Sequence, residues 1–211
     1  MNFSQKKIFN YCAEHTTPVS DVLIKLERET NLKTLAPQMA SGAFQGKLLE
    51  MLVRMSKPST VLEIGTFTGY SSICIGYALP DDATLHTIEV NRELQTIIQK
   101  HIEMAGLSKK IVTHVGNALE IIPTLDMTFD MVFIDAGKRD YALYYDSIID
   151  MVNPNGIILA DNVLWSGKVI DKNKDNDTRI IDDFNKKIFN DSRVDNITLP
   201  IRDGLTLAIK K

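Results

Sequence analysis

Two acidic residues and an amide follow apolar segments of the sequence, at positions where they could bind a metal ion. Asp135 comes directly after the apolar residues 131–134. Asp161 and Asn162 come directly after the apolar residues 156–160. If the two segments are neighbouring parallel strands, these side chains lie at the carboxyl edge of one sheet. Their oxygens are ligands that Mg²⁺ prefers, whereas nothing in the sequence resembles a zinc site. Asp-Asn alone is a common turn sequence, so the predicted cation site depends on Asp135 as well.

Lys138 lies three residues after Asp135 and is a candidate general base. Most lysines at the start of a helix are simply solvated. A cation bound nearby, however, disfavours the protonated amine. A neutral amine could then take a proton from a hydroxyl held at the same place. The two residues together predict metal-assisted deprotonation of a hydroxyl group.

A glycine-containing turn between residues 60 and 72 indicates a ligand-binding site. The apolar residues 60–64 give way to Gly65 and Gly69, and a helical pattern follows. The glycines supply backbone freedom and let a ligand approach a strand-to-helix turn. The turn lacks both the G-x-G-x-x-G and the G-x-x-x-x-G-K-[ST] phosphate-binding patterns. Glu63 would repel a phosphate but suits a ligand that carries an ammonium group and hydroxyls. A plain strand-to-helix turn is the alternative.

Glu89 ends the next apolar segment, about two dozen residues after the glycine turn. An acid at this spacing can accept hydrogen bonds from ribose hydroxyls, as in other nucleoside-binding sheets. The alternative is an acid that merely precedes a helix, since Asn91 opens the next helical pattern. The turn and the acid together favour ribose binding.

The elements that must position these residues alternate along the chain, which predicts a doubly wound, mostly parallel α/β sheet. The expected strands are 60–64, 84–89, 111–115, 129–134, 156–160, 193–199 and 205–209. The expected helices between them are 71–79, 91–105, 117–122, 139–152 and 178–189. A short link through Pro200 and Gly204 predicts an antiparallel hairpin at the end of the sheet.

The length of 211 residues fits a single domain, 1–211. We expect residues 1–40 to form accessory N-terminal helices, over 3–15 and 20–31, and residues 41–211 to form the core. The accessory helices could be a lid, a subunit contact or a layer packed on the core.

Composition excludes several classes of protein. The formal net charge of −3 argues against broad electrostatic binding to nucleic acid. No apolar stretch has the length of a membrane span, and no signal peptide follows Met1. Cys12 and Cys74 are too few for a disulfide framework or a metal knuckle. We therefore expect a cytoplasmic protein with no membrane partner.

Several stretches, met in order and at appropriate separations, resemble motifs of the cation-dependent O-methyltransferase family. This family includes caffeoyl-CoA and catechol O-methyltransferases and many bacterial relatives. The stretches are residues 133–138, 159–169 and 200–208, and the similarity runs from about Met39 onward. The glycine turn likewise resembles the cofactor loop of S-adenosylmethionine-dependent methyltransferases. The resemblance implies a class I methyltransferase fold, a Rossmann-like seven-stranded sheet with an antiparallel C-terminal strand.

The resemblance also implies roles for particular residues. A divalent cation, Mg²⁺ or alternatively Mn²⁺ or Ca²⁺, would be bound by Asp135, Asp161 and Asn162. Lys138 would be the catalytic base. S-adenosylmethionine would be bound by Met39, Ser41, Glu63, Gly65, Ser71, Glu89, Ala118 and Asp135. Trp165 and the polar residues 166–177 should cover the site, with Trp165 either stacking on the acceptor or anchoring the loop.

Three positions depart from the family pattern. Gly137 stands where catechol O-methyltransferase has a bulky aromatic side chain, so the mouth of the site should be wider. Arg202 replaces a small residue of the caffeoyl-CoA branch. No acid near Ile197 matches the late glutamate of the catechol enzyme. The identity of the acceptor is therefore open.

The predicted reaction is methyl transfer from S-adenosylmethionine to a hydroxyl of a catechol-like, caffeoyl-type aromatic molecule. A cation binds two adjacent oxygens well, which favours such an acceptor. Methylation of a hydroxylated uridine in tRNA is the second possibility, with Lys109, Lys110, Lys186, Lys187, Lys210 and Lys211 as a basic edge. A cofactor-binding module without catalysis is a third, which the intact set of metal and base residues argues against. A homodimer is expected from the family.

Overall fold

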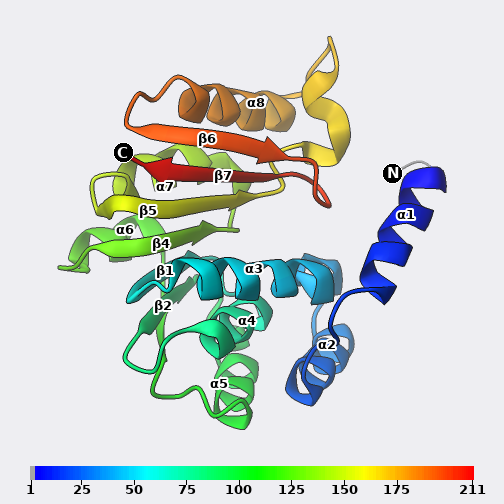
Figure 1. The fold of residues 1–211 in the computed structure, drawn as a ribbon, viewed down its shortest axis with the longest axis vertical. Helices are drawn as coiled ribbons and strands as arrows, with labels where there is room; N and C mark the ends of the chain where they lie inside the picture. The colour runs from blue at the N-terminus through cyan, green and yellow to red at the C-terminus, as the bar shows by residue number, and fades with distance from the viewer. Residues whose placement is uncertain (1–2) are drawn as a thin grey trace.

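The computed structural model describes residues 3–211, and a seven-stranded sheet forms the centre of this part of the chain (Figure 1). The strand order is β3-β2-β1-β4-β5-β7-β6. The strands are β1 (Thr60–Ile64), β2 (Thr84–Glu89), β3 (Ile111–Val115), β4 (Phe129–Ile134), β5 (Val152–Asp161), β6 (Val194–Leu199) and β7 (Leu205–Lys210). Strands β1 to β5 pair in parallel, and β7 is antiparallel to both β5 and β6. The predicted α/β fold with an antiparallel ending is confirmed.

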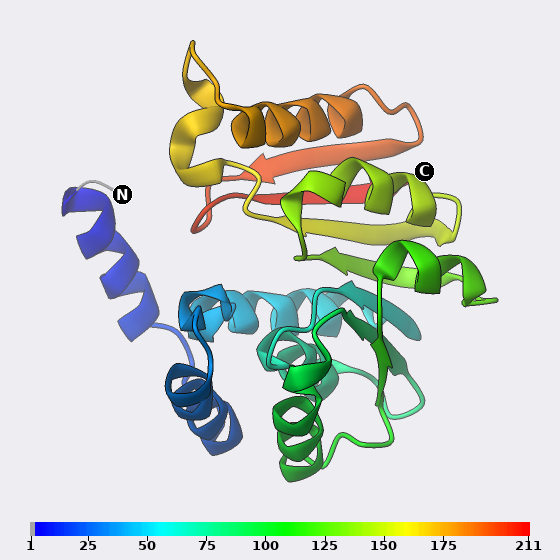
Figure 2. The same cartoon turned by 180° about the vertical axis from the view of Figure 1, so that it is seen from behind.

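Helices cover both faces of the sheet (Figures 1 and 2). Helices α2 (Asp21–Lys33), α3 (Gly42–Ser56), α4 (Tyr70–Ala78) and α5 (Gln95–Met104) lie on one face. Helices α6 (Ala118–Ile121), α7 (Tyr141–Ile148) and α8 (Asn176–Phe189) lie on the other. Short 3₁₀ segments are η1 (Pro37–Met39), η2 (Arg92–Leu94), η3 (Ile122–Thr124), η4 (Lys138–Asp140) and η5 (Trp165–Ile170).

The central strands are buried on both faces, which explains their continuous apolar sequences. In β4, Val132 and Ile134 pack into the core under α7 and α8. Met131 and Phe133 alternate with them and pack into the core under α3 and α4. This double burial fixes the register of β4, because a shift by one residue would exchange its two faces.

Several boundaries differ from the prediction, among them the end of α7 and the start of β5. Strand β5 begins at Val152, before the predicted 156, because Val152 pairs with Phe129 ahead of a bulge in the ladder. Helix α7 consequently ends at Ile148 instead of 152. A turn in which Met151 N–H donates to the Ile148 carbonyl at 2.8 Å separates the two elements. Long-range pairing, which a local pattern does not contain, decides both boundaries.

Helix α2 is part of the packed core. Leu23 and Leu26 are fully buried, and Thr30 Oγ1 donates to Thr68 Oγ1 in the glycine turn at 2.9 Å. Helix α1 (Phe3–Glu14) projects from the body in both views, and the Phe9 ring packs on Phe44 at 5.1 Å (Figures 1 and 2). Of the roles considered for the N-terminal helices, α2 therefore forms a layer packed on the core. None of the helices in the described residues combines the length and apolar character of a membrane span.

Candidate active site

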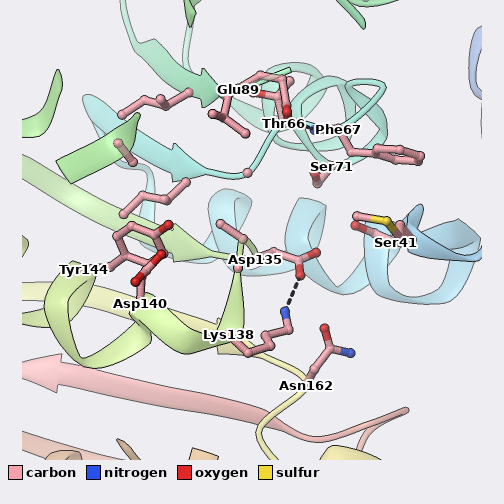
Figure 3. A pocket seen from close by; sticks show the side chains of 18 of the residues that line it. Ser41, Thr66, Phe67, Ser71, Glu89, Asp135, Lys138, Asp140, Tyr144 and Asn162 are labelled. Atoms are coloured by element: carbon pink, nitrogen blue, oxygen red, sulfur yellow. Dashed lines mark hydrogen bonds and ion pairs between the residues drawn. The ribbon is translucent and has the colours of Figure 1, made fainter. Parts of the chain in front are cut away.

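A cavity of about 530 Å³ lies at the carboxyl ends of β1, β2 and β4 (Figure 3). Most of the residues predicted for the site line this one cavity. They are Met39, Ser41, Gly65, Ser71, Glu89, Ala118, Asp135, Lys138 and Asn162. Glu63 and Asp161 do not line it and lie behind its wall. Residues far apart in the sequence are brought together because the parallel strands end at the same edge.

Gly65 makes the turn after β1 possible. Its φ is +101°, in the region that favours glycine. A Cβ atom at this position would lie 2.2 Å from the Asp135 carbonyl oxygen. The backbone N–H of Asp135 meanwhile donates to the Ile64 carbonyl at 2.9 Å. The ends of β1 and β4 are therefore held so close that only glycine fits between them.

Glu89 is fixed at the end of β2 by backbone donors. Its Oε2 accepts from the Phe67 N–H at 2.7 Å and its Oε1 from the Asn91 N–H at 2.8 Å. Each carboxylate oxygen has a further lone pair, so hydroxyls of a ligand can still be bound. The predicted ribose-binding acid is therefore held in a single orientation on the cavity wall.

Glu63 lies beneath the turn and is fully buried. Its Oε2 accepts from Thr87 Oγ1 at 2.5 Å and from Ser72 Oγ. Its Oε1 has no hydrogen-bond partner among the described residues. Burial raises the pKa of Glu63 to about 7, although these hydroxyl donors and Ser71 oppose the shift. Glu63 thus supports the turn from the protein interior, whereas Ser71 lines the cavity.

Asp135 and Asp161 occupy neighbouring strand ends, because Ile134 of β4 pairs with Ala160 of β5. Asp161 is 3% exposed, and its Oδ2 accepts from Gln45 Nε2 at 2.8 Å. Burial raises the pKa of Asp135, Lys138 opposes the shift, and the charge of Asp161 adds to it. The charge of Asp161 therefore disfavours ionisation of Asp135, an effect that a bound cation would relieve.

Asn162 completes the predicted ligand set. Its φ is +59°, and its side chain points toward Asp135 and Lys138 (Figure 3). The part of the chain that the structure describes has no metal-binding group of three or more His, Cys, Asp or Glu side chains. Two carboxylates and one carboxamide offer oxygen ligands and leave positions for water or substrate, which fits a hard cation such as Mg²⁺ better than zinc.

Lys138 stands between the first cavity and a second one of about 320 Å³. Its Nζ donates to Asp135 Oδ1 at 3.0 Å and to Tyr141 OH at 2.6 Å. The second cavity is also lined by Trp165 and by Ile180 of α8. A Cβ atom on Gly137 would meet nothing within 4 Å, in agreement with the wide mouth predicted there. Lys138 is therefore shared by the two cavities.

Sequence reasoning missed several residues of the site. Phe67 lies between the two glycines and lines the cavity with a φ of +49°, so its place in the turn was the available signal. Asp140 and Tyr144, four residues apart at helical spacing, also line the cavity. No local signal marks Gln45, because its partner Asp161 is 116 residues away.

Comparisons with known proteins agree with this geometry. A model of the O-methyltransferase family matches residues 13–211. Caffeoyl-CoA O-methyltransferase 2 of Petunia hybrida is 37% identical over 185 residues, which cover 80% of this chain and 75% of the relative. Caffeoyl-CoA O-methyltransferase 1 of Nicotiana tabacum is 37% identical over 196 residues, covering 85% and 81%.

Two solved structures share the fold and contain the cofactor or its product. A SAH-bound methyltransferase of Podospora anserina superposes with a TM-score of 0.91 at 26% identity, covering 100% of this chain and 98% of the other. A SAM-bound O-methyltransferase of Streptomyces achromogenes, involved in tomaymycin synthesis, gives 0.90 at 32% identity and covers 100% of both chains. This chain therefore belongs to the S-adenosylmethionine-dependent O-methyltransferase family that includes the caffeoyl-CoA O-methyltransferases.

Proposed function

We propose that the protein methylates a hydroxyl of a catechol-like aromatic molecule, using a divalent cation and Lys138 as the base. The observation that supports this most directly is the position of Lys138 Nζ. It lies 3.0 Å from Asp135 Oδ1 and close to Asn162 (Figure 3), and the residue that carries it lines both cavities. One cavity then serves the methyl donor and the other the acceptor.

The first cavity has the size and the polar groups that a nucleoside cofactor requires. Glu89 would bind the ribose hydroxyls, and Ala118 would border the adenine. Met39, Ser41, Gly65, Ser71 and Asp135 would surround the methionine part, with Glu63 behind Ser71. When bound, S-adenosylmethionine supplies a methyl carbon whose C–S bond breaks with both electrons going to sulfur as the acceptor oxygen bonds to carbon.

Asp135, Asp161 and Asn162 would hold a divalent cation, and their all-oxygen donor set suits Mg²⁺ as well as Mn²⁺ or Ca²⁺. A cation held by these residues would supply Lewis-acid chemistry, which would lower the pKa of the acceptor hydroxyl and stabilise the charge that develops on its oxygen. Lys138 accepts the hydroxyl proton at Nζ. The rigid strand ends keep the reacting groups in one geometry, which can supply several kcal/mol of the acceleration.

The second cavity would hold the aromatic ring of the acceptor. Trp165 and Ile180 offer an apolar surface, and Lys138 lies at the inner end. The plant relatives at 37% identity are named for caffeoyl-CoA, an acceptor with a catechol ring. Residues 166–177 would cover this cavity, since Asp177 lines it.

Methylation of a hydroxylated uridine in tRNA is less well supported. Many of the lysines considered for a basic edge are engaged with acidic side chains or carbonyls. Lys110, Lys186, Lys187 and Lys211 have acidic partners, and Lys210 donates to two backbone carbonyls. These contacts reduce the positive charge available to phosphates. A homodimer and a cytoplasmic location remain predictions.

The proposal is tested by transfer of a labelled methyl group to a panel of acceptors. The panel contains a caffeoyl-type catechol, the matching monophenol and tRNA that contains hydroxyuridine, each with Mg²⁺ or with EDTA. We expect methylation of the catechol that is lost in EDTA and restored by Mg²⁺. Methylation of tRNA without turnover of the catechol would favour the alternative, and turnover unaffected by EDTA would refute the metal-assisted mechanism.

A further inference from the structure

Tyr141 lies directly beneath the proposed base and takes no part in the reaction described above. It is the first residue of α7 and is fully buried. Its hydroxyl oxygen lies 2.6 Å from Lys138 Nζ, 3.1 Å from the Asp161 carbonyl oxygen and 3.2 Å from the Ile134 carbonyl oxygen. The hydroxyl therefore connects Lys138 to the backbone at the ends of β4 and β5.

The direction of these hydrogen bonds follows from the number of protons. A phenol has one proton, and a carbonyl oxygen can only accept. The Tyr141 proton is directed to the carbonyls of Ile134 and Asp161. In the contact with Lys138, the tyrosine oxygen therefore accepts and the lysine donates. Asp135 Oδ1 accepts a second N–H from the same amine.

This count determines where a neutral amine presents its lone pair. A neutral lysine has two N–H groups and one lone pair at roughly tetrahedral directions. When Asp135 and Tyr141 accept both N–H groups, the lone pair is left in the remaining direction. Lys138 borders both cavities, and in the proposed function this remaining direction is the one that would receive the acceptor hydroxyl. A hydroxyl that could donate to Nζ would instead occupy the lone pair.

We propose that Tyr141 is a positioning residue that directs the lone pair of Lys138 toward the acceptor hydroxyl. This inference rests on the proposed function of Lys138 as the base. Tyr141 acts as an acceptor toward Nζ because two backbone carbonyls hold its proton. The proton that leaves the acceptor oxygen then has one receiving orbital, and the negative charge stays on that oxygen for attack on the methyl carbon.

The surroundings of Tyr141 make the hydroxyl a rigid support. The ring packs edge-on against Phe184 of α8, with centroids 5.1 Å apart and an interplanar angle of 69°. Helix α7 also provides a matched control. Tyr145 is fully buried, packs edge-on against the same Phe184 at 6.4 Å, and donates to Asp191 Oδ2 at 3.0 Å. Tyr145 lines neither cavity.

The test compares Tyr141→Phe with Tyr145→Phe, in the wild-type chain and in Lys138→Met. Initial rates of labelled methyl transfer are measured with both substrates and Mg²⁺ saturating, and S-adenosylmethionine binding is measured by calorimetry. We expect Tyr141→Phe to lower kcat about ten- to a hundredfold, which is no more than the lower end of the roughly hundred- to ten-thousandfold that general base catalysis contributes. The Kd for S-adenosylmethionine should stay within twofold, and Tyr145→Phe should leave kcat within twofold. Thermal unfolding of both variants reports the structural cost of losing either hydroxyl.

The double variants separate positioning from a general structural effect. If Tyr141 acts through Lys138, Tyr141→Phe causes no more than a twofold further loss in the Lys138→Met background. The inference would be overturned if Tyr141→Phe caused an equal loss in both backgrounds. It would also be overturned if kcat of Tyr141→Phe were unchanged while that of Lys138→Met was impaired. Either result would leave the proposed function intact. A wild-type rate for Lys138→Met would instead remove Lys138 as the base and overturn both.

Discussion

Gln45 Nε2 donates a hydrogen bond to Asp161 Oδ2 at 2.8 Å, and both side chains are buried. Gln45 lies on α3 and Asp161 ends β5, so the bond crosses from a helix to the proposed cation site. A donor to one carboxylate oxygen fixes the direction of the other oxygen. Gln45 therefore orients a proposed metal ligand without lining the cavity.

Substitution of Gln45 should weaken the response to Mg²⁺. Loss of a hydrogen-bond partner of a metal ligand typically reduces metal affinity ten- to a hundredfold. For Gln45→Leu we expect the Mg²⁺ concentration at half-maximal activity to rise at least about tenfold, with a smaller change in kcat at saturating Mg²⁺. The control is Gln99→Leu, which removes an exposed hydrogen bond to Thr113. An unchanged Mg²⁺ titration for Gln45→Leu would show that Asp161 does not need this donor.

Substitution of Gly65 should cost stability, whereas Gly137 should tolerate the same change. Gly65→Ala combines a φ of +101° with a clash against the Asp135 backbone. We expect it to lower the free energy of unfolding by about 2 kcal/mol or more. Gly137 has a φ of −61° and open space where an added methyl group would lie, so Gly137→Ala should stay within about 0.5 kcal/mol of wild type. Chemical denaturation measures both, and equal stabilities would contradict the close approach at Gly65.

The buried Glu63 should make stability depend on pH. Burial raises its pKa from 4.5 to about 7, so the folded protein holds this proton more tightly than the unfolded chain. The resulting stability is complete below pH 4.5 and is lost as the pH rises through 7. Between pH 5 and 8, the cofactor-free wild type should lose up to about 3 kcal/mol relative to Glu63→Gln.

Denaturation curves at several pH values test this expectation for Glu63. The exposed Glu120 provides the control, since Glu120→Gln should leave the pH dependence of the wild type unchanged. A parallel pH dependence of wild type and Glu63→Gln would show that Glu63 ionises at the same pH in the folded and unfolded states.

Arg202 should contribute to cofactor binding from outside the cavity. Its guanidinium donates to the Ser41 carbonyl and to Gln45 Oε1, and Ser41 lines the cavity. Both hydrogen bonds come from one guanidinium nitrogen, and the ammonium of lysine lies on a shorter, flexible side chain that does not place a donor at the same position. For Arg202→Lys we expect the Kd for S-adenosylmethionine to rise about five- to tenfold, the value of one lost hydrogen bond. Calorimetry measures the change, with Arg179→Lys on the exposed side of α8 as control.

The sequence was most informative where a local pattern determines a position in the fold. Asp135, Asp161 and Glu89 were predictable because each directly follows or ends an apolar strand, and parallel strands place their ends together. Gly65 was predictable because a strand-to-helix turn requires backbone freedom. The structure adds that Glu63 lies behind the cavity wall and does not line the cavity. The pattern of residues along β1 does not predict this position, because the strand is buried on both faces.

Contacts between distant segments were not predictable in the same way. The hydrogen bonds of Gln45 and Arg202 join residues 116 and 157 positions apart. Tyr141 has an ordinary helical environment in the sequence, and its role depends on two carbonyl groups supplied by β4 and β5. Such contacts depend on how the helices and strands pack in three dimensions, and a single sequence read by itself does not reveal that packing.

The placement of β7 between β5 and β6 has a consequence for how the enzyme matures on the ribosome. Asp161 pairs with Leu205, so the strand that carries this acid receives its second neighbour only after residues 205–210 have been synthesised. Strands β1, β2 and β3 are mutual neighbours and can associate much earlier in translation. During translation, β1, β2 and β3 can therefore pair before β5 can gain its second neighbour.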